Sequence, residues 1–205
     1  MPTNLVFRNQ SNDVNNSSIV IFQQNVAVNL GELPVAWVVI ENCAIGNYHP
    51  FTYTYDLEIS AADSYGNFTP QIEAENGKRY QMYLSTSGNS LGLEGNGTSP
   101  TEVQVINNLP QGAITANCYR SGKLLATKTT IAPQQFAAFQ FNPIIYVGVV
   151  AQVLEGEVMD SAILSSSNTQ FNLLGIASAD IVMYGGGGGR GSQAFRFELE
   201  NVVMM

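Results

Sequence analysis

The feature that most constrains this chain is a series of short apolar segments between Glu102 and Phe141, separated by turn residues. Apolar runs of this length, broken by Gly, Pro and Asn at short intervals, predict antiparallel strands joined by tight connections. The runs are Val103–Ile106, Ile114–Tyr119, Lys123–Thr130 and Phe136–Phe141, with breaks at Asn107-Asn108, Ser121-Gly122 and Pro133-Gln134-Gln135. No segment of the chain shows a sustained helical period, so we expect an all-β protein.

The remaining sequence continues this pattern in both directions. Val35–Ile40 is continuously apolar, which predicts a strand buried on both faces. Asn76-Gly77, between Gln71–Glu75 and Lys78–Leu84, predicts a β-hairpin with a type I′ turn. The last segment alternates, with Phe195, Phe197 and Leu199 on one face and Arg196, Glu198 and Glu200 on the other. Further strands are expected at Leu5–Phe7, Ile19–Phe22, Phe51–Tyr55, Leu57–Ala61, Ile144–Leu154, Val158–Leu164, Phe171–Ile176 and Ile181–Tyr184.

These strands predict packed antiparallel sheets in a β-sandwich or jelly-roll arrangement. Ser87–Pro100, rich in Gly, Ser, Asn and Thr, is the candidate boundary between an N-terminal half at 1–100 and a C-terminal half at 101–205. The alternative is one continuous domain.

The two halves share a layout, which suggests a duplication. A strand ends in Asn, an Ile-led strand follows, and a Pro precedes an aromatic apolar strand. The matched positions are Asn9 with Asn107, Ile19 with Ile114, Pro34 with Pro133, and Val35–Ile40 with Phe136–Phe141. The alternative is that any antiparallel protein repeats strand and turn.

Composition limits the classes of partner. Charged residues make up 12% of the chain, about half of the roughly 25% that is usual. Asn and Gln together number 33, so the polar surface must be built mainly from amides and hydroxyls, which suits a sugar ligand or dense assembly. A net charge of −8 with three lysines argues against nucleic acid and against electrostatic attachment to anionic lipid.

Cys43 and Cys118 are expected to be two buried thiols, the alternative being a single disulfide. The first residues lack a basic segment followed by an apolar run, so no classical signal peptide is expected. The expected location is therefore the cytoplasm, or outside the cell after release by a non-classical route. No apolar run is long enough for a membrane helix.

The candidate ligand-binding residues are aromatic and lie in one segment. Phe51, Tyr53 and Tyr55 share a strand face by the two-residue period, and Tyr48 and His49 precede them. Aromatic faces stack on sugars, but three aromatics on one face also make good core contacts. His49 is the single histidine, so it would have to serve any Ser-His-Asp catalysis, and a structural role is the simpler expectation.

Two other motifs have plain structural interpretations. Glu155, Glu157 and Asp160 could offer oxygens to Ca²⁺, but they lack the spacing of a dedicated loop and are expected to form an exposed acidic turn. Gly185–Gly189 with Arg190 lacks the Lys and the following helix of a phosphate loop, so a hairpin loop is expected. No metal and no cofactor is predicted.

The sequence favours a non-enzymatic protein that acts by self-association or surface binding, as a homo-oligomer or assembly. Ile144–Leu154, which carries no charge, is either a self-association patch or part of the core. Two alternatives are a lectin-like protein that binds glycans and a pore-forming protein in which Val158–Ile176 refolds into an amphipathic hairpin.

Overall fold

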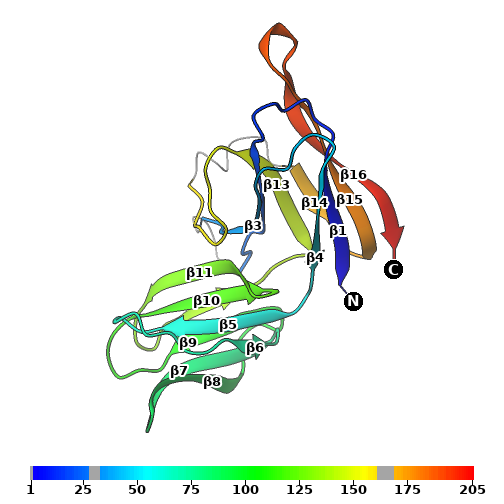
Figure 1. Cartoon of the computed structure of the whole chain (residues 1–205). Helices are drawn as coiled ribbons and strands as arrows, with labels where there is room; N and C mark the ends of the chain where they lie inside the picture. Colours follow the sequence, from blue (N-terminus) through cyan, green and yellow to red (C-terminus); the bar gives the residue numbers. More distant parts are fainter. Residues whose placement is uncertain (1, 28–32, 161–168) are drawn as a thin grey trace. The chain divides into compact units, whose positions relative to one another are not determined.

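The computed structural model describes residues 2–27, 33–160 and 169–205 (Figure 1). The described residues form sixteen β-strands and one 3-10 turn at Gly189–Gly191, so the prediction of an all-β protein is confirmed. The strands are β1 Thr3–Asn9, β2 Ser18–Phe22, β3 Ala36–Ile40, β4 Tyr48–Tyr53, β5 Leu57–Ala62, β6 Ile72–Ala74, β7 Lys78–Ser85, β8 Gly88–Asn96, β9 Val103–Asn107, β10 Ile114–Arg120, β11 Lys123–Ile131, β12 Phe136–Phe139, β13 Ile144–Val150, β14 Thr169–Asn172, β15 Ile176–Gly186 and β16 Gln193–Met204.

The chain divides into two compact units that interleave along the sequence. Unit 1 comprises Met1–Gln23, Leu33–Tyr55 and Pro143–Met205, and unit 2 comprises Gln24–Glu32 and Asp56–Asn142. The boundary expected between residues 100 and 101 lies within unit 2, in the connection from β8 to β9.

Unit 1 holds two four-stranded sheets, with the orders β16-β15-β1-β4 and β14-β13-β2-β3. All of its pairings are antiparallel except that of β1 with β15. Side chains from the two sheets meet, because Trp37 of β3 contacts the rings of Phe51 and Tyr53 on β4. Fully buried Phe7, Ile21 and Trp37 belong to this core.

Unit 2 is built in the same way. Its sheets have the orders β11-β10-β5-β6 and β12-β9-β7-β8, and the one parallel pair is β7 with β9. Ile59, Met82, Leu125 and Phe139 are fully buried here. Where apolar and polar residues alternate, as on β1 and β10, one face of the strand is directed toward a core.

The predicted hairpin at Asn76-Gly77 is wrong. β6 pairs with β5 and β7 pairs with β8 and β9, so the turn connects strands of different sheets. Glu75 O accepts a hydrogen bond from Lys78 N at 3.2 Å, and Gly77 alone of the two central residues has positive φ, at +81°. That pattern suits a turn with glycine at its third position, whereas a type I′ turn needs two positive φ values. Glycine is still required, because a Cβ at Gly77 would lie 3.2 Å from Pro100 O.

Two further expectations change. Much of the polar stretch Ser87–Pro100 is strand β8 rather than a loop, since Gly88 to Asn96 pair with β7. The strand part of the run Ile144–Leu154 belongs to the interior, because β13 (Ile144–Val150) pairs with β14 on one side and β2 on the other, and Ile145 and Val147 are fully buried. The run is therefore not an edge strand available for self-association.

Predictions that depend on neighbouring residues, such as a turn between consecutive strands or alternation along one strand, were confirmed. Ser121 and Gly122 both have positive φ, 54° and 73°, in the connection between the paired strands β10 and β11. On β16, Phe197 is buried while Arg196 and Glu198 are exposed, as the alternation predicts. Cys43 and Cys118 are free, buried thiols, and burial raises the pKa of Cys118 to about 12.

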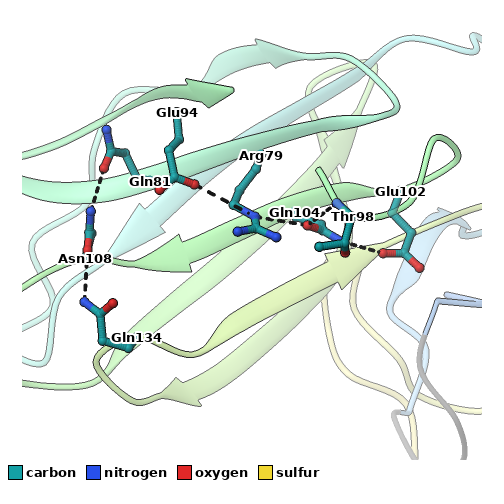
Figure 2. Close-up of polar contacts among 8 residues, drawn as sticks. All are labelled: Arg79, Gln81, Glu94, Thr98, Glu102, Gln104, Asn108 and Gln134. Atoms are coloured by element: carbon teal, nitrogen blue, oxygen red, sulfur yellow. Dashed lines mark hydrogen bonds and ion pairs between the residues drawn. The ribbon is translucent and has the colours of Figure 1, made fainter. Parts of the chain in front are cut away.

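Amide side chains connect the strands of one sheet in unit 2, as Figure 2 shows. Gln104 of β9 is fully buried, and its Oε1 accepts hydrogen bonds from Arg79 Nε and Thr98 N. Its Nε2 donates to Thr98 Oγ1 and to Glu102 Oε2. In the same sheet, Asn108 donates to Gln81 and accepts from Gln134. The abundant amides therefore act in part as internal connectors and not solely as a solvated surface.

The ends of β1 and β9 are each held by a buried asparagine. Asn9 Nδ2 donates to Cys43 O at 2.6 Å, and its Oδ1 accepts from Ser11 N at 3.0 Å. Asn107 Nδ2 donates to Ile131 O at 2.8 Å, and its Oδ1 accepts from Leu109 N at 3.1 Å. Each amide thereby satisfies backbone groups that are closed off from water.

We expect Asn9→Ala and Asn107→Ala each to lower the free energy of unfolding by about 1–3 kcal/mol, because each leaves buried backbone groups without a partner. Urea denaturation measures the change, with Asn4→Ala, at an exposed position of β1, as the control. A variant at either buried position as stable as the control would contradict the assignment.

A candidate functional site beside the Asp63–Asn67 loop

The best-formed site lies in unit 2, where β5 ends and the loop 63–67 begins. The Asp63 carboxylate organises this loop. Its Oδ1 accepts hydrogen bonds from Tyr65 N at 2.9 Å and Asn67 N at 3.0 Å. Its Oδ2 accepts from Asn67 Nδ2 at 3.0 Å and from Asn89 Nδ2 of β8 at 3.1 Å. An Asp side chain that binds backbone N–H groups two and four residues onward fixes a tight loop.

These hydrogen bonds also determine the acidity of Asp63. The Asn67 side chain and backbone, followed by the Tyr65 backbone and the Asn89 side chain, hold the pKa of this carboxyl below its ordinary value of 3.8. The carboxylate therefore remains ionised at neutral pH, and its role is to position the loop.

The loop forms one wall of a cleft of about 370 Å³. Two other connections complete it: the segment from β9 to β10, which follows the buried Asn107, and the hairpin from β7 to β8. The lining residues are Asp63, Ser64, Tyr65, Leu84, Asn89, Leu109, Pro110, Gln111, Gly112 and Ala113. Three connections far apart in the sequence are thus brought together at one end of unit 2.

A second groove, of about 560 Å³, continues from the same loop. It shares Asp63, Ser64 and Ala113 with the first cleft. Its other lining residues are Ala62, Gly66, Phe68, Ile114, Thr115, Asn117, Thr127, Thr129 and Thr130. The two hollows therefore share part of one wall.

Each hollow is lined by one exposed aromatic ring, the first cleft by Tyr65 and the second groove by Phe68. Tyr65 is 89% exposed and Phe68 is 68% exposed, although both side chains have large apolar surfaces. Hydroxyls and amides of Ser64, Asn89 and Gln111 offer both donors and acceptors, and neither lining contains Lys or Arg. A neutral ligand with hydroxyl groups and an apolar face matches this chemistry better than an anion.

The aromatic residues expected to bind a ligand do not share one accessible surface. Tyr53 is 1% exposed and packs edge-on against Trp37 and Tyr55, which is the core role considered for it. Phe51 is half-buried beside Trp37. Tyr48 and His49 are exposed on β4, and the Arg8 guanidinium lies 5.7 Å from the Tyr48 ring centre.

The remaining motifs fall as follows. Glu157 Oε2 accepts a hydrogen bond from Leu154 N in an exposed acidic turn, and no group of potential metal ligands occurs among the described residues. Gly185 and Gly186 are the last residues of β15 and the following glycines lead toward β16; a Cβ at Gly185 would overlap Ala194 O. Val158–Ile176 lies partly outside the described residues, since 161–168 are not described. Within the described chain, no helix is long and apolar enough to cross a membrane.

The cleft was not predicted from the sequence, although one of its walls is the short segment Asp63-Ser64-Tyr65-Gly66-Asn67. A usable signal was present: Asp and Asn flank a Gly there, and two aromatics occupy positions where a plain loop would carry polar residues. The rest of the lining comes from distant connections that no local pattern joins. Comparisons with known protein families, with curated proteins and with solved structures give no match.

The lowered pKa of Asp63 predicts a pH dependence. The stabilisation that the Asp63 carboxylate provides is complete above pH 3.8, the ordinary pKa of the group. It is lost as the pH falls through the lower pKa of the folded state. We therefore expect the thermal midpoints of wild type and Asp63→Asn to differ by a constant amount between about pH 5 and 7 and to converge in more acidic solution. A difference that stays the same down to about pH 2 would contradict this role for the carboxylate.

Proposed function

We propose that this chain is a non-enzymatic carbohydrate-binding protein that holds a neutral glycan in the cleft beside the Asp63–Asn67 loop. The observation that carries the proposal is the exposed Tyr65 ring at a cleft lined by amides and hydroxyls and lacking cations. Sugar rings offer C–H faces that pack on aromatic rings and hydroxyls that pair with amides, so both kinds of lining group find a partner.

The proposed architecture is a pair of β-sandwiches of jelly-roll type, one in each unit. The two four-stranded sheets of each unit and the contact of Trp37 with the opposite sheet support this arrangement. Loops gather at the ends of such sandwiches, and binding residues are commonly carried on loops held by a rigid scaffold. Asp63 supplies that rigidity here, since its four hydrogen bonds fix the loop before a ligand arrives.

An array of neutral glycans, followed by calorimetric titration of the strongest binders, tests the proposal. We expect Tyr65→Ala to weaken binding by about tenfold or more, because truncating a central aromatic contact commonly costs more than about 1 kcal/mol. Tyr48→Ala is the matched control: it removes another exposed tyrosine, from unit 1, and tests the aromatic segment first expected from the sequence. No binding to any glycan, or equal losses in the two variants, would reject the cleft.

Self-association remains a second proposed function, and it now rests on β16. This strand is at the edge of its sheet and carries neither Lys nor Pro, the residues that commonly protect edges. Beyond Asn201, whose φ is +50°, Val202, Val203 and Met204 are 43%, 54% and 63% exposed. A second copy of the chain could cover this apolar end by strand pairing.

Light scattering across a concentration series tests this second function. We expect the wild type to exceed 22.1 kDa at high concentration and Val203→Lys to return it to the monomer mass, because a charge on an edge opposes pairing. Val14→Lys, at a position 75% exposed in unit 1, is the control and should associate like the wild type. A wild type that remains monomeric throughout would end the proposal.

A further inference from the structure

The two units have the same strand pairings. Among the described residues each unit has six, and every pairing in unit 1 has a counterpart of the same direction in unit 2. The parallel pair β1–β15 corresponds to β9–β7. The antiparallel pairs correspond as β1–β4 to β9–β12, β2–β3 to β10–β11, β13–β2 to β5–β10, β13–β14 to β5–β6, and β15–β16 to β7–β8.

The correspondence follows the order of the chain. Strands β1–β4 match β9–β12, and strands β5–β8 match β13–β16, each in sequence. The chain therefore contains the same eight-stranded series twice, first in residues 3–96 and again in residues 103–204. Neither series makes up a compact unit by itself: unit 1 joins β1–β4 to β13–β16, and unit 2 joins β5–β8 to β9–β12. Figure 1 shows this as blue strands beside orange and red ones in unit 1.

Individual hydrogen bonds repeat along with the strands. Asn9 N donates to Asn47 O, and Asn107 N donates to Gln135 O. In both units the next residue donates to the parallel partner strand, Gln10 N to Met183 O of β15 at 2.9 Å and Asn108 N to Met82 O of β7 at 2.8 Å. The side-chain contacts of Asn9 and Asn107 described above occupy the same places.

The turn before the fourth strand is also the same in both units. Asn47 N donates to Ala44 O, and Gln135 N donates to Ala132 O. The third residue of each turn donates to the asparagine carbonyl, Gly46 N to Asn9 O and Gln134 N to Asn107 O, and both have positive φ, 82° and 68°. Positive φ is uncommon at a non-glycine residue, so its occurrence at Gln134, the position matched to Gly46, has weight.

The other four-strand block repeats a turn before its third strand. Ile176 N donates to Leu173 O in unit 1, and Lys78 N donates to Glu75 O in unit 2. Each turn has a glycine with positive φ, Gly175 at 77° and Gly77 at 81°. Past the fourth strand, Met205 N donates to Gly175 O and Gly97 N donates to Gly77 O.

We infer that the chain is a tandem duplication whose two copies have exchanged their second four strands, so that each half is the binding partner of the other. Two strand pairings in each unit join the two halves of the chain. They are β1 with β15 and β2 with β13 in unit 1, and β9 with β7 and β10 with β5 in unit 2. The sequence match of Asn9 with Asn107 holds. The match of Val35–Ile40 with Phe136–Phe141 is wrong, because the counterpart of β12 is β4 and not Val35–Ile40.

Cleavage of the full chain between its halves tests the exchange. A protease site inserted between Pro100 and Thr101, both exposed, separates the two series without cutting a strand. The cleaved protein should elute in native buffer as one species with the mass of the intact chain, about 22.1 kDa, and should separate in denaturant. Two species of about half that mass in native buffer would overturn the exchange.

A transplanted turn tests the duplication itself. The triple variant Ile45→Pro, Gly46→Gln and Asn47→Gln gives the turn of unit 1 the residues of its counterpart at 132–135. We expect a thermal midpoint within about 3 °C of the wild type, since matched turns accept the same residues. The same three residues placed in the loop at 63–67, as Tyr65→Pro, Gly66→Gln and Asn67→Gln, should lower the midpoint by about 5 °C or more. Equal losses in both transplants would overturn the correspondence.

Discussion

The structure depends on two buried asparagines at the ends of parallel-paired strands. Where β1 and β9 end, the chain leaves the sheet and its backbone groups would be cut off from both the ladder and water. Asn9 and Asn107 supply one acceptor and one donor to those groups, to Ser11 N and Cys43 O in one unit and to Leu109 N and Ile131 O in the other. Because an unpaired backbone group in the interior is costly, few side chains could replace the amide there. Residues on both sides of each asparagine are consequently held in place.

The local part of this fold could be predicted from the sequence, and the long-range part could not. Alternation on β16 and the Ser121-Gly122 turn were predictable because each is decided by neighbouring residues. The pairing of β1 with β15 joins residues about 170 positions apart, and an apolar strand pairs equally well with many others. The hairpin predicted at Asn76-Gly77 was wrong for the same reason. A glycine with positive φ fits both a hairpin turn and a turn between sheets, and the flanking residues do not distinguish the two.

The sequence indicated the duplication only in part, because the repeated backbone hydrogen bonds are preserved more widely than the side chains. The repeated hydrogen bonds are mostly made by backbone atoms, which any sequence supplies, so the turns at 44–47 and 132–135 share only the alanine in four residues. The buried asparagine is the exception, because its side chain makes the bonds. For this reason the match of Asn9 with Asn107 is correct. The match of Val35–Ile40 with Phe136–Phe141, which rests on apolar strand residues alone, is wrong.

The corresponding loops of the two units explain why the candidate site is placed in unit 2. In unit 1 the connection from β1 to β2 meets the glycine-rich end of β15: Asn12 N donates to Gly185 O at 2.7 Å, and a Cβ on Gly186 would lie 3.3 Å from Asp13 N. Glycine thus allows backbone to pack on backbone there. In unit 2 the matched region carries Leu84 of β7, Asn89 of β8 and Gln111 of the β9–β10 connection, and these residues border the cleft. One scaffold therefore supports a closed contact in unit 1 and an open cleft in unit 2, and the strand ends and loops carry the difference.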